Sequence, residues 1–213
     1  MRQRVATRAE IVEAWVRGWA ASRGTSAPVA VPGGFLIEVG LPGHVARYVL
    51  AEYDRSAVHD LAASVTVPGT WIKVCADPAE VTLPAGWEIQ PADHMMTGPL
   101  DPVAPVPPAP YSLRVAAEGD VTVAEVRAPD GEVAARGRLA RSGGYGIPDQ
   151  IRTEPAHRRR GLGGVVMRAL TASAHSGGAR TGVLVATLEG RALYETLGWT
   201  LRSLVTAAVY RPA

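Results

Sequence analysis

This chain of 213 residues is poor in several features that mark common classes of protein. Its single cysteine, Cys75, excludes an intramolecular disulfide, and we expect a buried, unreactive thiol in a reducing, cytoplasmic protein. No run of about 18 or more apolar residues occurs, which predicts no membrane span, and the N-terminal segment lacks the apolar core of a signal peptide. The five histidines have no metal-ligand spacing, so we predict no metal site.

An excess of either charge is also missing. The formal net charge is +2, which is too small to indicate nucleic acid or an anionic membrane as a partner. Lys73 is the only lysine, so arginine supplies nearly all of the basic residues. Apolar residues make up 47% of the chain, and this share predicts a globular protein with one large domain or two small lobes.

The first 96 residues predict an α/β lobe. Thr7 and Glu10 have the spacing of a capping box ahead of an amphipathic helix at 8–22. The other expected elements are a helix at 56–65 and strands at 35–39, 46–52, 71–76 and 86–93. Residues 97–110 follow, and six of these fourteen residues are proline, which predicts a stiff, extended linker between two lobes.

Residues 111–213 predict a second α/β domain, with a mixed sheet flanked by helices. Strands are expected at 113–117, 121–127, 132–139, 145–153, 183–187 and 199–210, and helices at 161–175 and 189–197. The order strand, helix, strand and then Gly-Trp occurs in both halves of the chain. Two related lobes explain this repetition, although strands and helices alternate in many α/β proteins and chance also explains it.

The segment with the clearest chemistry is residues 151–164, between an expected strand and an expected helix. Its glycines fall at the helix start, at Gly161, Gly163 and Gly164. The first N–H groups of a helix lack internal partners and favour an anion, and three arginines add positive charge there, Arg158, Arg159 and Arg160. A phosphate or pyrophosphate is the predicted ligand, with a solvated arginine run or a nucleic-acid contact as alternatives. The motifs of a Walker loop and of a dinucleotide-binding loop are absent.

The pattern Arg158-x-x-Gly161-x-Gly163, placed shortly after Pro155, resembles the signature of the GNAT superfamily of acetyltransferases, Arg/Gln-x-x-Gly-x-Gly/Ala. Members often have glycine at the position of Arg159.

A second mark of the same superfamily is a tyrosine four residues before a glycine-aromatic pair, here Tyr194 before Gly198-Trp199. The resemblance covers about residues 112–213. The two-lobe layout is similar to glycine N-acyltransferase-like members, whose first half resembles a degenerate GNAT lobe.

The resemblance implies that acetyl-CoA is the co-substrate and that two strands splay apart around its pantetheine arm. The residues implied to hold it are Ile151, Arg152, Thr153, Arg158, Arg159, Arg160, Gly161, Leu162, Gly163 and Gly164. Tyr194 is implied to donate a proton to the leaving thiolate; the alternative is a packed tyrosine with its hydroxyl at the surface.

A general base is expected on the strand that precedes the loop. On a regular strand the residues at 147, 149, 151 and 153 share one face, and Asp149 is the only acid among them. Asp149 is therefore the first candidate, with a solvated residue at the strand start as its alternative. Glu154, at the strand end, is a weaker candidate.

These residues predict an N-acetyltransferase that moves an acetyl group from acetyl-CoA directly to a primary amine of a small molecule or amino acid. The alternatives are acetylation of a protein N-terminus or lysine, and a non-catalytic acyl-CoA sensor or interaction module. Residues of the first lobe are expected to wall the acceptor pocket, among them His94, Met95 and Met96, although methionines more often pack in a core. The expected assembly is a monomer or homodimer.

Overall fold

The computed structural model describes residues 6–212, so the start of the N-terminal segment considered above, residues 1–5, lies outside it. The helices are α1 (Arg8–Arg23), α2 (Arg55–Ser64), η1 (Pro155–His157, a short 3-10 helix), α3 (Leu162–Ser176) and α4 (Leu188–Thr196). The strands are β1 (Val29–Val31), β2 (Gly34–Leu41), β3 (His44–Leu50), β4 (Thr70–Val74), β5 (Trp87–Ile89), β6 (Asp93–Pro99), β7 (Ser112–Glu118), β8 (Val121–Arg127), β9 (Val133–Ser142), β10 (Tyr145–Thr153), β11 (Thr181–Ala186) and β12 (Thr200–Tyr210). The predicted α/β class is confirmed.

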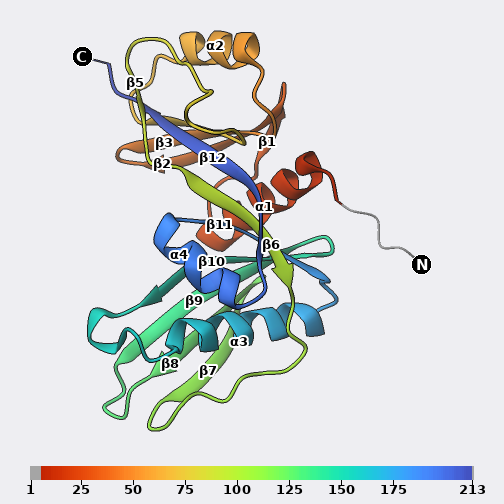
Figure 1. The fold of residues 1–213 in the computed structure, drawn as a ribbon, viewed down its shortest axis with the longest axis vertical. Helices are drawn as coiled ribbons and strands as arrows, with labels where there is room; N and C mark the ends of the chain where they lie inside the picture. Colours follow the sequence, from red (N-terminus) through yellow and green to blue (C-terminus); the bar gives the residue numbers. More distant parts are fainter. Residues whose placement is uncertain (1–5, 213) are drawn as a thin grey trace.

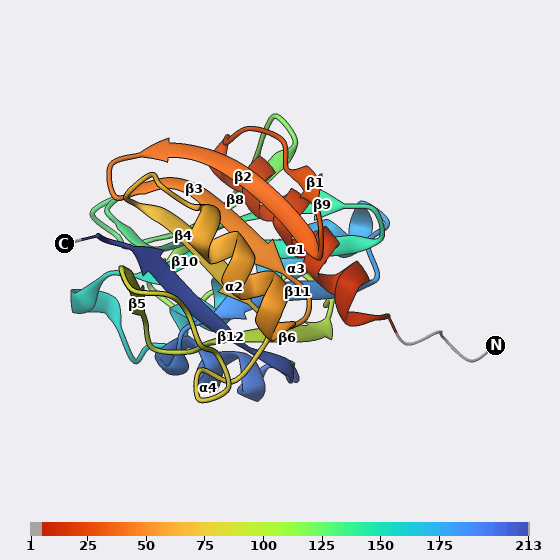
Figure 2. The same cartoon turned by 90° about the horizontal axis from the view of Figure 1, so that it is seen from above.

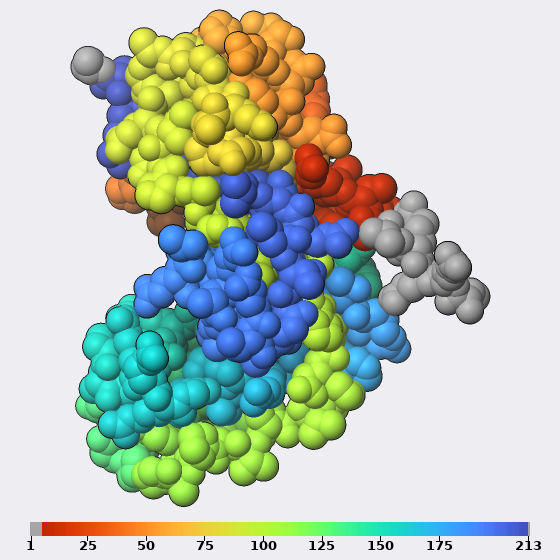
Figure 3. Space-filling model, in the orientation of Figure 1, coloured from red at the N-terminus to blue at the C-terminus, as the bar shows by residue number. Residues whose placement is uncertain are grey.

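The strands form one continuous sheet with two halves, which Figure 1 shows one above the other. The N-terminal half-sheet contains β1 to β5 and the end of β12, and the C-terminal half-sheet contains β6 to β11 and the start of β12. The single long strand β12 joins them, because its first residues pair with β6 and its last residues pair with β4 and β5. In space-filling view the halves are two masses, with the blue C-terminal segment at their junction (Figure 3).

Strand β6 changes the boundary that the sequence indicates between the lobes. The predicted linker begins at residue 97, whereas β6 continues to Pro99 and lies between β11 and β12. Residues 93–96, which the sequence assigns to the first lobe, therefore belong to the C-terminal half-sheet. The proline-rich composition could not show this, because the pairing of β6 depends on strands that lie about a hundred residues later in the chain.

Helix α1 lies between the two half-sheets and contacts β2, β3, β9, β10 and β11. The predicted capping box is present, since the Thr7 hydroxyl accepts from Glu10 N–H while the Glu10 carboxylate accepts from Thr7 N–H. Gly18 permits the close approach to β10, because a Cβ atom there would lie 2.6 Å from the Ile147 side chain. One apolar core, with residues of α1 and of both half-sheets, results from this packing.

The remaining helices cover the opposite faces. Helix α3 packs on β8, β9 and β10, on the face away from α1, and α2 covers the outer face of the N-terminal half-sheet (Figure 2). Within residues 6–212, no helix combines the length and apolar character needed to cross a membrane. The same residues contain no group of three or more histidine, cysteine, aspartate or glutamate side chains arranged to hold a metal ion.

Candidate functional site

Strands β10 and β11 are parallel neighbours, but they soon separate. Their register contains only the pairs Tyr145↔Thr181 and Gly146↔Gly182. Beyond these pairs β10 continues along β9 and β11 continues along β6. The two strands therefore diverge toward their C-terminal ends and leave an opening between them.

A bulge in β10 decides which side chains face this opening. Gln150 has a positive φ of 55°, and the register with β9 shifts between Asp149 and Arg152. Asp149 consequently faces α1, whereas the Ile151 side chain packs on the α3 side. The expectation that positions 147, 149, 151 and 153 share one face is wrong, because the bulge interrupts the regular alternation of the strand.

The backbone of the strand end is turned toward the opening. The Glu154 N–H group donates to Ala134 on the β9 side, at 2.9 Å. Because backbone groups alternate along a strand, those of Ile151 and Thr153 point away from β9 and toward the side from which β11 has diverged. These groups are available to an extended ligand that lies along the strand.

The loop after β10 leads into α3 without a side-chain cap. Gly161 is the N-cap residue, in left-handed conformation with φ 76°, and no side chain of residues 6–212 caps the first N–H groups of the helix. Arg159 also has a positive φ, 63°, which explains why glycine suits this position in similar sequences. The start of α3 therefore offers unpartnered N–H groups and the positive end of the helix dipole to an anion.

A groove of about 680 Å³ runs along this loop, the end of β10 and α4. In Figure 3 the teal loop and the blue α4 lie next to each other at the surface. The residues that line the groove are Ile151, Arg152, Thr153, Arg158, Arg159, Gly161, Leu162, Gly163, Gly164, Thr187, Glu189, Gly190, Ala192, Leu193, Tyr194 and Thr196. Nine of the ten residues expected to hold the cofactor are thus brought together.

Arg160 is the exception among the predicted binding residues. Its guanidinium donates to the Tyr111 hydroxyl at 3.0 Å, and that hydroxyl also lies 3.0 Å from Nδ1 of His157. Arg160 therefore fixes the loop to the start of β7 and does not line the groove. Sequence spacing gave no signal for Tyr111, because the contact spans 49 residues.

The groove is narrow at Gly163. A Cβ atom at this position would lie 3.2 Å from Cδ2 of Leu193 on α4 and 3.6 Å from Oγ1 of Thr153 on β10. The bare glycine backbone thus separates the two walls, and a branched side chain would occupy the space between them.

Tyr194 lies in the wall of the groove, on α4. Its side chain is buried, with 9% exposed, and its ring lies 6.1 Å from that of Trp199. The hydroxyl makes no hydrogen bond to another residue of the described chain 6–212. Burial, and secondly the negative charge of Asp149, raises the pKa of Tyr194 to about 12. The phenol is therefore protonated near neutral pH and has a proton to donate.

Asp149 lies on the other side of the opening, against the C-terminal end of α1. Its carboxylate accepts hydrogen bonds from the Ser22 hydroxyl at 2.8 Å and from two nitrogens of Arg23 at 2.7 and 3.0 Å. Burial raises the pKa of Asp149, but the hydrogen bonds and charge of Arg23, together with hydrogen bonds from Ser22 and the Gln150 N–H, more than offset it, so the pKa lies below its ordinary value. Sequence reasoning missed both partners, since neither is near Asp149 in the chain.

Glu154, the weaker candidate for a base, lies away from Asp149 at the end of β10. Its carboxylate forms an ion pair with Arg152 on the same strand, at 3.2 Å.

The three residues expected to wall the acceptor pocket lie on β6. Met95 and Met96 are both core residues, whereas the buried Nδ1 atom of His94 has no hydrogen-bond partner within the described chain. His94 pairs with Ala186 at the end of β11, beside the opening.

Diverging parallel strands, an uncapped glycine-rich helix start and a buried tyrosine together define the class of acyl-CoA N-acyltransferase folds. Residues 126–209 match the model of the family described as FR47-like protein. No curated protein matches the chain.

Solved structures match the chain over most or nearly all of its length. A GCN5-related N-acetyltransferase from Kribbella flavida has a TM-score of 0.66 and 18% identity, over 99% of this chain and 98% of that chain. A protein from Novosphingobium aromaticivorans, assigned to the GNAT family, has a TM-score of 0.62 and 19% identity, over 95% and 99%. A tandem GNAT protein from the clavulanic acid biosynthesis pathway has a TM-score of 0.52 and 15% identity, over 79% and 76%. The predicted GNAT fold is confirmed.

Proposed function

We propose that this protein is an N-acetyltransferase that moves an acetyl group from acetyl-CoA directly to a primary amine of a small molecule or amino acid. The observation that carries the proposal is the groove at the opening between β10 and β11. This groove combines the N–H groups at the start of α3, the backbone groups of Ile151 and Thr153 that point away from β9, and the buried side chain of Tyr194.

The residues around the groove fit coenzyme A. The N–H groups at the start of α3 suit the pyrophosphate, with Arg158 and Arg159 adding positive charge beside them. The free backbone groups of Ile151 and Thr153 suit the amide groups of the pantetheine arm. Gly163 keeps the passage between β10 and α4 open, since a Cβ atom there would meet Leu193.

The acetyl thioester supplies an activated acyl group, and the protein has to manage two protons. The acceptor amine has to lose a proton before it attacks, and an alkyl ammonium has a pKa of about 10.4. The departing sulfur gains a proton, and Tyr194, protonated and lining the groove, is placed to give it. The pKa of Asp149 is lowered, so its carboxylate stays ionised and attracts the acceptor ammonium. The proton of the ammonium then passes to water and not to Asp149.

The α1 side of the opening favours a small acceptor over a protein chain. Helix α1 and the N-terminal half-sheet cover that side, and only 13% of the Asp149 side chain is exposed. A peptide acceptor needs an open groove, whereas a closed space between two halves suits a small molecule.

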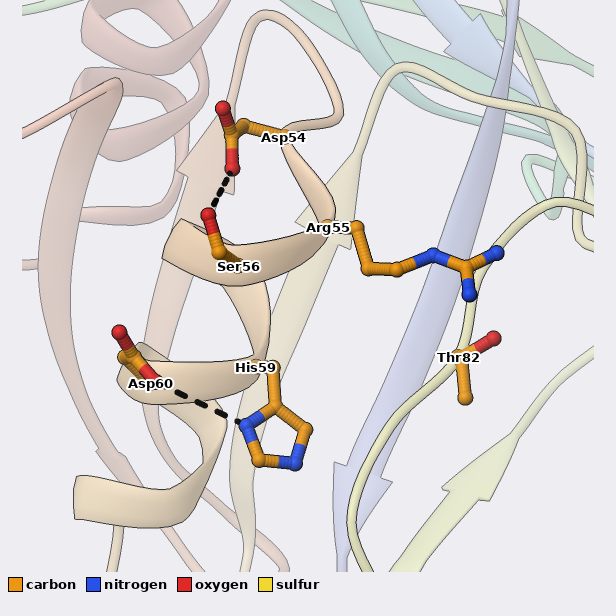
Figure 4. A pocket seen from close by; sticks show the side chains of 6 residues that line it. All are labelled: Asp54, Arg55, Ser56, His59, Asp60 and Thr82. Carbon is orange, nitrogen blue, oxygen red and sulfur yellow. Dashed lines mark hydrogen bonds and ion pairs between the residues drawn. The ribbon is translucent and has the colours of Figure 1, made fainter.

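The N-terminal half contains a second strand–helix–strand unit, β3–α2–β4, which we propose is a degenerate GNAT-like lobe without a coenzyme A site. Its parallel strands remain paired over five residues, from Ala46↔Thr70 to Leu50↔Val74, so they do not open. The Asp54 carboxylate caps α2, accepting from Ala57 N–H at 2.9 Å, and places negative charge where an anion would bind. Figure 4 shows Asp54 bound to Ser56 at this helix start.

A thiol-release assay with acetyl-CoA and a panel of primary amines tests the proposed function. We expect release that depends on both the protein and an amine, and acetylated product by mass spectrometry. Tight binding of acetyl-CoA without transfer to any amine, peptide or protein lysine would favour the sensor instead.

A further inference from the structure

A group of charged side chains lies between the two half-sheets, on the α1 side of the opening and out of the coenzyme A groove. We call it the charged cluster, and its members come from α1, β3, β4, β6 and β10: Arg23, Arg47, Lys73, Asp93 and Asp149. Arg23, Asp93 and Asp149 act electrostatically on Arg47, and Arg47 in turn acts on Lys73, so the five residues form one group. Asp149, a member of the cluster, lies beside the opening, and its negative charge also raises the pKa of Tyr194.

The charges of the cluster do not balance. Asp149 is paired with Arg23, through two hydrogen bonds. Asp93 is paired with the buried Lys73 through a short contact. Both carboxylates therefore have a cation of their own, and Arg47 is left without an anion of its own among residues 6–212.

The Arg47 side chain also lacks a hydrogen-bond partner in the part of the chain that the structure describes. It is 7% exposed, and its buried Nε atom has no partner within residues 6–212. Its guanidinium lies over the Trp19 ring, 4.2 Å from the centroid, and Arg23 lies over the same ring at 4.7 Å. Burial and the charge of Arg23 lower the pKa of Arg47 to about 10, so it is still a cation near neutral pH. A buried cation without an anion is costly, which indicates that a ligand supplies the missing charge.

His44 extends this unsatisfied region. Its ring lies 6.1 Å from Trp19 and 5.6 Å from Trp71, and its buried Nε2 atom has no partner in the described chain. Burial, with the charge of Arg47 next, lowers the pKa of His44 to about 4, so the ring is neutral. A neutral ring can donate one hydrogen bond to an anion without adding to the positive charge.

We propose that Arg47 binds a carboxylate of the acceptor, so that the acceptor is a small amine that also carries a carboxylate, as an amino acid does. This inference rests on the proposed function and narrows its substrate class. A guanidinium binds a carboxylate through two parallel hydrogen bonds. The Trp19 ring supports the Arg47 guanidinium from one side, with its centroid 4.2 Å away. The acceptor then lies with its carboxylate on Arg47 and its amine toward Asp149 and the opening.

The test compares Arg47→Met with wild type on matched acceptors, each an amino acid and its carboxamide. Methionine keeps much of the side-chain volume and removes the charge. We expect KM for the amino acids to rise by about tenfold or more with kcat little changed, and kcat/KM for the carboxamides to stay the same. For each acceptor, the ratio of kcat/KM in the variant to kcat/KM in wild type cancels the effect of the different basicities of the two amines. Arg17→Met is the matched control, since Arg17 is an exposed arginine on α1 that pairs with Glu13 and lies outside the charged cluster.

A second measurement uses the wild type alone and does not depend on how the variant folds. Carboxylic acids that match the acceptor but lack its amine should inhibit competitively against the acceptor, and the corresponding amides should not. Equal inhibition by acids and amides, or equal losses on both acceptor classes in Arg47→Met, would overturn the carboxylate site while transfer to amines still stands. Absence of acetyl-CoA binding or of transfer to any amine would instead overturn the proposed function, and the carboxylate site with it.

Discussion

Arg23 at the end of α1 donates to both carboxylate oxygens of Asp149 on β10, and this pair joins the helix between the half-sheets to the strand at the opening. The contact spans 126 residues of the chain. It lowers the pKa of Asp149 and connects the C-terminal end of α1 to the strand at the opening.

The Arg23–Asp149 pair should contribute a measurable, pH-dependent coupling energy. Because the pKa of Asp149 is lowered in the folded state, the contribution is present above about pH 4 and is lost as pH falls through the folded-state pKa. Arg23 is partly exposed, so we expect a coupling of about 1 kcal/mol. Urea unfolding of Arg23→Gln, Asp149→Asn and the double variant, at neutral and acidic pH, measures it. The same coupling energy at both pH values would contradict the lowered pKa of Asp149.

Tyr194→Phe should lower turnover by about 100-fold and leave acetyl-CoA binding intact, because it removes the proton donor and keeps the ring packed on Trp199. Thiol release gives kcat, and calorimetry gives the affinity for acetyl-CoA. Undiminished turnover on a genuine acceptor would remove Tyr194 from the mechanism.

The pKa of Tyr194 predicts a separate signal. Five of the six tyrosines stay in the variant, so the difference between the ultraviolet titrations of wild type and Tyr194→Phe isolates one phenol. That phenol should titrate at about 12. Since its pKa is raised in the folded state, its contribution to stability is full below about pH 10 and is lost as pH rises toward 12. A midpoint near 10 would show that the side chain is not buried.

Gly163→Val should weaken acetyl-CoA binding by about 10- to 100-fold, because a branched side chain would fill the passage between β10 and α4. Gly163→Ala is the matched control, since alanine is the alternative residue in the sequence pattern and its Cβ needs only a small shift of Leu193. Calorimetry compares the three proteins, and circular dichroism verifies their folding. Unimpaired binding by a folded valine variant would show that this groove does not hold the cofactor.

Arg159→Gly should leave the protein as stable as wild type or stabilise it by up to about 1 kcal/mol. Arg159 adopts φ 63°, a conformation that costs an L-residue energy and costs glycine almost none, while glycine gains freedom in the unfolded chain. Thermal unfolding measures the change, with Arg159→Ala as the control that removes the charge but keeps the strain. A loss of stability well above 1 kcal/mol for glycine alone would mean that the loop adopts a different backbone conformation.

Each chain should bind one acetyl-CoA, because β3 and β4 stay paired and Asp54 occupies the start of α2. Calorimetric titration of wild type gives the stoichiometry directly. The Gly163→Val variant should bind acetyl-CoA about 10- to 100-fold more weakly at this site, so a second, unaffected binding event in that variant would locate a coenzyme A site in the N-terminal half.

The sequence by itself determined the features that depend on neighbours in the chain. The capping box of α1, the glycine-rich start of α3 and the spacing of Tyr194 before Gly198 are local, and each was placed correctly on its element. Local hydrogen bonding and helix periodicity are sufficient for such predictions.

Only the tertiary structure decided the contacts between elements that are distant in the chain. The bulge at Gln150 turns Asp149 toward Arg23, the start of β12 receives β6 as its neighbour, and Arg47 is buried with no anion of its own. None of these has a pattern in the sequence, because each depends on which distant strands pair and on how burial changes the cost of a charge. The sequence thus indicates coenzyme A as the co-substrate, and the packing of the two halves brings together the residues of the proposed acceptor side.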